Sequence, residues 1–188
     1  MMINRQALID LLAKYSAKRG DFTLASGRRS DFYVDARLTT MSPEGLSLIG
    51  PIALDTLRWA DWKADSVGGL TLGADPIAYA ISYASAATSS PLRAFSVRKE
   101  AKTHGTGKLV EGPFRSGDSV VIIEDVITTG SSALQAAKAV RDAGGTIIGV
   151  LALVDREEGG GDAIRDAGMD VLSLTTRTQI MSAMSKAS

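Results

Sequence analysis

Apolar positions near the start of the chain recur at helical spacing. The pattern over residues 3–17 predicts an amphipathic helix that stops near Gly20. Residues 21–38 behave differently, because their apolar side chains come in short groups broken by a Ser-Gly pair, and this predicts short strands around a turn. Ser42 followed by a proline predicts an N-cap and a helix that runs through about residue 59.

From residue 66 onward, short apolar runs alternate with helical patterns. Four runs have the length of buried strands: residues 66–70, 92–97, 119–123 and 146–154. Helices are expected from about residues 75 and 131, and a last helix within residues 175–188. This alternation indicates an α/β fold, in which a parallel sheet carries helices on both faces. We expect residues 1–40 to form a cap on a core of residues 41–188.

The composition narrows the class of protein. The chain has 188 residues, with 45% hydrophobic and 22% charged, as in ordinary soluble globular proteins. Its 21 basic and 21 acidic residues cancel, so we expect neither nucleic acid nor a membrane as partner. It lacks cysteine, which excludes disulfides and thiolate metal sites and fits a reducing cytoplasm. Nothing resembles a secretory signal or an apolar membrane span.

The most informative local pattern is an apolar run that leads into two acids and a hydroxyl-rich turn. Glu124 and Asp125 follow the run, and the turn then enters a helix; its residues are Thr128, Thr129, Gly130, Ser131 and Ser132. Unpaired amides at a helix N-terminus bind phosphate, and carboxylates accept hydrogen bonds from ribose hydroxyls or hold a hydrated Mg²⁺. The pattern therefore favours a sugar phosphate, although a serine N-cap after a polar strand end explains it too.

Residues 123–132 closely resemble the phosphoribosyl-pyrophosphate (PRPP) motif of the type I phosphoribosyltransferases. The resemblance implies that family's fold and its homodimer. It also implies Mg²⁺, held mainly by PRPP and water near Glu124 and Asp125. Val126 and Ile127 then belong to the PRPP site with the turn, and Thr128 also reaches the acceptor base. The acids would hold the ribose.

A glycine-rich segment, residues 68–76, follows the first predicted core strand. Its amides can form an anion-binding nest, although a plain tight turn fits equally well. In the family, the corresponding loop holds pyrophosphate, which implicates Leu72 and Gly73 here. Many relatives have a second glycine or a lysine where this chain has Ala74 and Asp75.

A cationic segment follows the strand predicted at residues 92–97. It contains Arg98, Lys99, Lys102 and His104 among glycines. Such a run is often a solvated loop, but it also suits a lid that neutralises a diphosphate. The sequence of residues 98–105 resembles the catalytic loop of the orotate phosphoribosyltransferases, the pyrimidine branch of the family. Lys99, Lys102 and His104, with Asp125, are then the expected catalytic residues, and the loop is expected to cross into the partner subunit.

Two further segments resemble the orotate branch. Residues 22–33 are similar to its opening hood over the base, which implicates Phe32 and Tyr33, and Arg156 stands where the family binds the orotate carboxylate. The expected reaction transfers ribose 5-phosphate from PRPP to orotate, giving orotidine 5'-monophosphate (OMP) in pyrimidine biosynthesis. Alternatives are transfer to another base, a PRPP-sensing regulator that binds nucleic acid, and a binding protein without chemistry.

Overall fold

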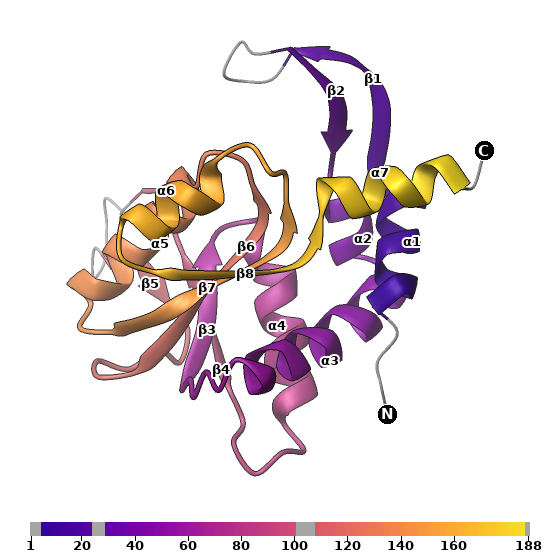
Figure 1. Cartoon of the computed structure of the whole chain (residues 1–188). Coiled ribbons are helices and arrows are strands. Elements are labelled where there is room, and N and C mark those ends of the chain that lie inside the picture. Colours follow the sequence, from indigo (N-terminus) through magenta and orange to yellow (C-terminus); the bar gives the residue numbers. More distant parts are fainter. Residues whose placement is uncertain (1–4, 24–28, 101–107, 187–188) are drawn as a thin grey trace.

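The computed structural model describes residues 5–23, 29–100 and 108–186. Its centre is a six-stranded sheet (Figure 1), whose strands lie in the order β5 (Val110–Glu111), β4 (Arg93–Val97), β3 (Ser66–Leu70), β6 (Ser119–Ile127), β7 (Thr146–Asp155) and β8 (Asp170–Thr176). Every neighbouring pair is parallel except β4 and β5. The expected α/β fold with a parallel sheet is confirmed.

Helices cover both faces of this sheet. They are α3 (Pro43–Trp59) and α4 (Ala74–Ser85) on one face, and α5 (Ser131–Asp142) and α6 (Gly160–Asp166) on the other. Alternate residues of β6 point to opposite faces: Val121 and Ile123 pack with α3 and α4, whereas Val120 and Ile122 pack with α5. The central strand is therefore buried on both sides, as its continuous apolar run predicts.

The N-terminal part forms a hairpin that projects from the core (Figure 1). The hairpin is formed by β1 (Ala17–Thr23) and β2 (Arg29–Val34), with α1 (Arg5–Tyr15) before it and the short α2 (Arg37–Thr40) after it. The C-terminal helix α7 (Arg177–Lys186) packs against α1. The short strands predicted here are confirmed, whereas the Ser-Gly pair predicted to form the turn lies outside the described residues. The predicted helix ends earlier than expected, because Gly20 lies inside β1 and the chain turns at Ser16, whose hydroxyl bonds Thr39 at 2.7 Å.

The central strand β6 was predicted too short. β6 continues beyond residue 123 to Ile127, because it stays paired with β7 up to the pair Ile127 and Asp155. Glu124 and Asp125 therefore lie within the strand and not after its end. The helices predicted from residue 43, near residue 75, from residue 131 and after residue 175 are confirmed. Within the described part of the chain, no helix is long and apolar enough to cross a bilayer.

Candidate active site

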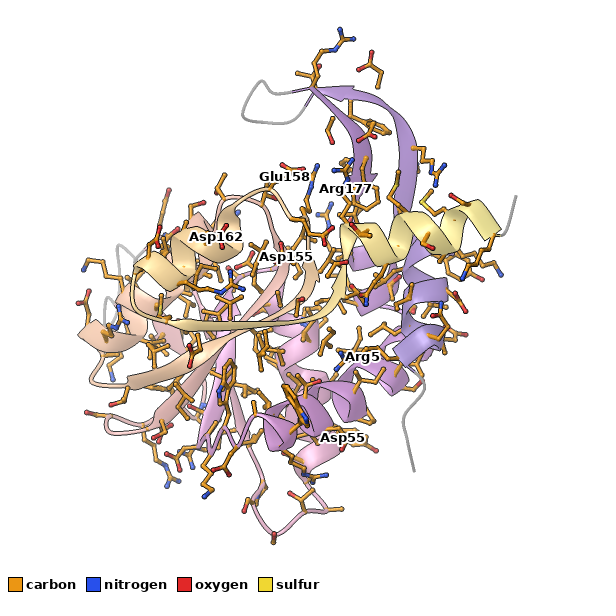
Figure 2. All side chains as sticks on the ribbon, in the orientation of Figure 1. Arg5, Asp55, Asp155, Glu158, Asp162 and Arg177 are labelled. Carbon is orange, nitrogen blue, oxygen red and sulfur yellow. The ribbon has the colours of Figure 1, made fainter. Side chains whose placement is uncertain are left out.

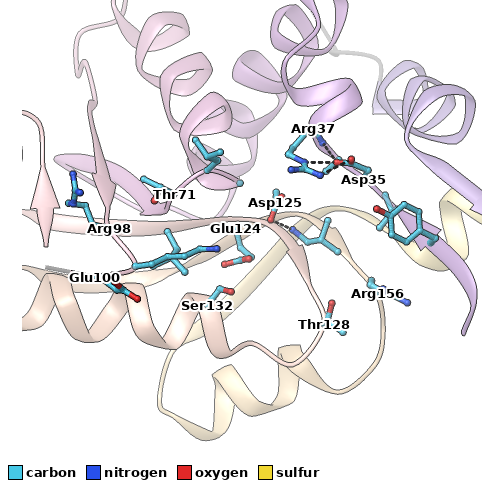
Figure 3. Close-up of a pocket in the computed structure, with 18 residues that line it drawn as sticks. Asp35, Arg37, Thr71, Arg98, Glu100, Glu124, Asp125, Thr128, Ser132 and Arg156 are labelled. Atoms are coloured by element: carbon cyan, nitrogen blue, oxygen red, sulfur yellow. Dashed lines mark hydrogen bonds and ion pairs between the residues drawn. The ribbon is translucent and has the colours of Figure 1, made fainter. Parts of the chain in front are cut away.

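A cavity of about 950 Å³ opens where the carboxyl ends of β3 and β6 face the base of the hairpin (Figure 3). Segments that are far apart in the sequence form its wall. Its lining residues are Tyr33, Val34, Asp35, Ala36, Arg37, Leu70, Thr71, Leu72, Gly73, Arg98, Lys99, Glu100, Glu124, Asp125, Val126, Thr128, Ser132 and Arg156. This is the edge at which open α/β sheets bind ligands.

Two adjacent carboxyl groups form the floor of the cavity. Glu124 is buried, and burial raises its pKa to about 8, with a further contribution from the Asp125 charge. Burial also raises the pKa of Asp125, although its carboxylate accepts a hydrogen bond from the Val126 amide at 2.8 Å. Without a ligand, Glu124 is therefore mostly protonated at neutral pH, and a bound cation or hydroxyl donor would favour its ionised form.

The hydroxyl-rich turn encloses a smaller cavity of about 200 Å³. Its lining residues are Glu124, Val126, Ile127, Thr128, Thr129, Gly130, Ser131 and Ser132. Gly130 occupies the N-cap position of α5 with φ of 80° and supplies no capping side chain, although the Thr129 hydroxyl accepts from the Ser131 amide at 3.4 Å. A Cβ at Gly130 would lie 2.8 Å from the carbonyl oxygen of Gly160. The turn thus needs glycine, and its amides face an anion-sized hollow.

The glycine-rich segment after β3 passes close to the acidic pair. A Cβ at Gly73 would lie 2.5 to 2.6 Å from the carboxyl atoms of Asp125, so a side chain at this position would displace that carboxylate. The neighbouring Leu72 is 65% exposed, and Thr71 is tied to the sheet by a 2.8 Å bond from its amide to Val97. The loop that was expected to hold pyrophosphate therefore contacts the carboxylate that was expected to hold ribose.

Arg156 links the core to the hairpin. Its Nη2 atom donates to the Ser30 hydroxyl and the Phe32 carbonyl, both at 3.1 Å, and pairs with Glu158 at 2.7 Å. The side chain is only 6% exposed, and its buried Nε has no protein partner. The guanidinium is thus held rigidly beside the cavity that it lines.

The two neighbouring aromatic residues of β2 have different environments. Tyr33 lines the cavity, whereas Phe32 is fully buried, and the guanidinium carbons of Arg156 and Arg177 lie 5.9 and 5.8 Å from the centre of its ring. Arg177 also pairs with Asp31, and Figure 2 shows Arg177 beside the base of the hairpin. Phe32 therefore supports the wall and does not form the cavity surface.

The structure brings together most of the residues selected from the sequence. Arg98 and Lys99 line the cavity, whereas Lys102 and His104 lie outside the described residues. The sequence reasoning missed Asp35 and Arg37, which also line it. The sequence could have indicated them, because a negative and a positive side chain follow directly after the segment that resembles the hood.

Comparisons with known proteins agree with this geometry. The phosphoribosyl transferase domain family matches residues 41–170. An orotate phosphoribosyltransferase from Aquifex aeolicus is 45% identical over 96% of this chain and 100% of its own length. The chain belongs to the orotate phosphoribosyltransferase family. A Mycobacterium leprae member is 45% identical over 89% of this chain and 90% of its own length.

Solved orotate phosphoribosyltransferases share the fold. The Mycobacterium tuberculosis enzyme in complex with PRPP superposes with a TM-score of 0.79 at 40% identity, covering 94% of this chain and 98% of that one. The same enzyme with Fe(III) dicitrate gives a TM-score of 0.81 at 43% identity, with the same coverage. The chain thus shares the overall fold of these solved members of the family.

Proposed function

We propose that this orotate phosphoribosyltransferase family member transfers ribose 5-phosphate from PRPP to N1 of orotate, releasing OMP and pyrophosphate. The observation that carries the proposal is the buried pair Glu124 and Asp125, which adjoins both an amide-lined turn and the Gly73 loop. Family relatives named for orotate and a relative bound to PRPP support the choice of both substrates.

The hydroxyl-rich turn would anchor the 5'-phosphate. Its amides and hydroxyls surround a hollow of about 200 Å³, at the positive end of α5. Asp125, with Glu124, would accept hydrogen bonds from the ribose hydroxyls. Because the phosphate and the ribose are fixed at separate points, the anomeric carbon is positioned as well as bound.

Charge separation at the anomeric carbon is the main demand of the reaction. The sugar gains positive, oxocarbenium-like character while the pyrophosphate gains negative charge, so no protein nucleophile is needed. Asp125 would favour the positive sugar. Arg98, Lys99 and the amides of Leu72 and Gly73 would bind the leaving diphosphate, together with Lys102 and His104 from outside the described residues; either of these last two would donate a proton to it.

Arg156 and Thr128 would bind orotate, with Tyr33 against the base. The place of Arg156 in the cavity wall supports this assignment, because a guanidinium suits a carboxylate. Phe32 would act indirectly, since its ring and carbonyl hold Arg156 in place. The division at residue 40 between hood and core remains part of the proposal.

The donor set fits Mg²⁺ that is held chiefly by PRPP. Among the described residues, no three His, Cys, Asp or Glu side chains gather into a metal site, but Glu124 and Asp125 offer the hard oxygen ligands that this ion prefers. When bound, Mg²⁺ would neutralise charge on the diphosphate.

We also propose a cytoplasmic homodimer in which the cationic loop serves the partner's site. Mixing an inactive Lys102→Ala protein with an inactive Asp125→Asn protein should then restore activity, because some mixed dimers contain one intact site. Unmixed proteins provide the baseline. If mixing restores nothing although the subunits exchange, sharing is refuted.

The reaction itself is tested by following the loss of orotate absorbance after addition of PRPP and Mg²⁺. Arg156→Ala and Asp125→Asn should lose turnover. A protein that consumes PRPP with another base and not with orotate would refute the acceptor alone. A protein that binds PRPP without turnover of any base would support a sensing role instead.

A further inference from the structure

Asp35 and Arg37 form a rigid ion pair in the cavity wall. Asp35 follows β2, and its amide donates to the carbonyl of Ser16 at 2.9 Å. Its carboxylate accepts from Nε and Nη2 of Arg37 at 2.8 and 2.9 Å, and from the Arg37 amide at 3.1 Å. This two-pronged geometry fixes the plane of the guanidinium.

The pair leaves one edge of the guanidinium available. Within the described chain, both hydrogen bonds that the Arg37 side chain donates go to Asp35, and its Nη1 makes none. The Arg37 side chain is 54% exposed, compared with 22% for that of Asp35, and both residues line the 950 Å³ cavity. A preorganised donor edge therefore faces the space that a substrate would occupy.

Arg37 lies close to the junction of the ribose and diphosphate positions. Figure 3 shows Arg37 and Asp35 above Asp125, and the carboxylate of Asp125 in turn contacts the backbone at Gly73. Burial raises the pKa of Asp125; the charge of Arg37 lowers it and that of Asp35 raises it. Both members of the ion pair therefore lie within electrostatic reach of the Asp125 carboxylate.

The cations that would serve the diphosphate loop, including Arg98 and Lys99 named above, come from other segments of the cavity wall. Residues 71–73 carry no charged side chain. The guanidinium of Arg156 is engaged with Glu158 and the hairpin, and that of Arg98 lies 3.8 Å from Glu111. The acidic partners of Arg156 and Arg98 do not line the cavity, whereas Asp35, the partner of Arg37, does. The ion pair with Asp35 therefore keeps the Arg37 guanidinium in the described cavity wall.

We propose that Arg37 donates its free guanidinium edge to the diphosphate of PRPP, and that Asp35 is the positioning residue that aims it. The proposal rests on the proposed function. A diphosphate is favoured over the ribose hydroxyls, because guanidinium matches phosphate oxygens in charge and geometry, whereas Asp125 already supplies the acceptor that ribose hydroxyls need.

Binding measurements with three ligands separate the possible roles. Isothermal titration would give the affinities of PRPP with Mg²⁺, of pyrophosphate with Mg²⁺, and of OMP, which has the ribose and 5'-phosphate but no diphosphate. Arg37→Ala should weaken PRPP and pyrophosphate on the order of tenfold and leave OMP within about twofold. Asp35→Asn should give the same selective loss at a smaller size, and Arg37→Lys should fall between Arg37→Ala and wild type.

A matched control is Arg29→Ala, which removes another hood arginine paired with an aspartate, Asp21, outside the cavity lining. It should change none of the three affinities. Equal weakening of PRPP and OMP in Arg37→Ala, or no weakening of either, would overturn the proposal. If Arg37→Ala does not fold, the same comparison is made with Arg37→Lys. A wild-type protein that binds neither PRPP nor OMP would refute the proposed function instead.

Discussion

Replacing Glu124 by glutamine is expected to make the ligand-free protein more stable at alkaline pH. Glu124 is only 8% exposed, and burial first and the charge of Asp125 second raise its pKa. The folded protein keeps the Glu124 proton up to about pH 8, whereas the unfolded chain releases it near 4.5. Between these values the folded state binds more protons, so this group makes stability fall as pH rises. Glutamine remains neutral and removes that loss.

The size of the effect follows from the same two values. A shift from 4.5 to about 8 corresponds to roughly 5 kcal/mol at about 1.4 kcal/mol per pH unit. The difference in unfolding free energy between Glu124→Gln and wild type should therefore be smallest near pH 4.5. It should grow through the neutral range and level off above about pH 8.

Urea denaturation at fixed protein concentration, without PRPP or metal, would measure this difference across the pH range. Comparing the two proteins at each pH cancels the titration of all other groups to first order. Glu44→Gln, a change at an exposed carboxylate in the first turn of α3, controls for the loss of a surface charge. A difference between Glu124→Gln and wild type that stays constant from pH 5 to 9 would refute the reasoning.

Three other substitutions test the site and its support. Gly73→Ala should lower kcat/KM by at least roughly tenfold, because the new Cβ would come within 2.6 Å of the Asp125 carboxylate; unchanged kinetics would contradict the tight contact. Arg156→Lys should raise KM for orotate on the order of tenfold with little change in PRPP affinity, since lysine lacks the planar fork; equal losses for both substrates would argue against a carboxylate contact. Asp118→Asn should cost about 1 to 3 kcal/mol in urea denaturation, because the buried Asp118 bonds Arg93 and the Arg115 amide; a wild-type midpoint would show that neither bond matters.

Local chemistry made several elements predictable. The start of α3 was predicted correctly because the Ser42 hydroxyl accepts from the Gly45 amide at 3.0 Å, a cap that depends only on nearby residues. The turn at Gly130 was equally accessible, because positive φ and a close approach both need glycine.

Features that depend on distant partners could not be predicted. β6 was expected to stop at residue 123, because two acids interrupt its apolar run, but pairing with β7 carries the strand through them. Strand alternation places Phe32 and Tyr33 on opposite sides of β2, but which ring faces the cavity depends on distant partners, among them Arg156 and Arg177 next to Phe32. Strand β8 was not predicted, because its half-polar edge sequence lacks a clear apolar run.

Both ends of the described chain build the support for the hood. Arg19 of β1 donates to the Met181 carbonyl at 2.8 Å, and Arg177 pairs with Asp31 at 2.5 Å. A library that is meant to alter nucleobase preference should therefore vary α7 together with the hairpin. If only the hairpin were varied, the α7 residues that contact it would stay unchanged.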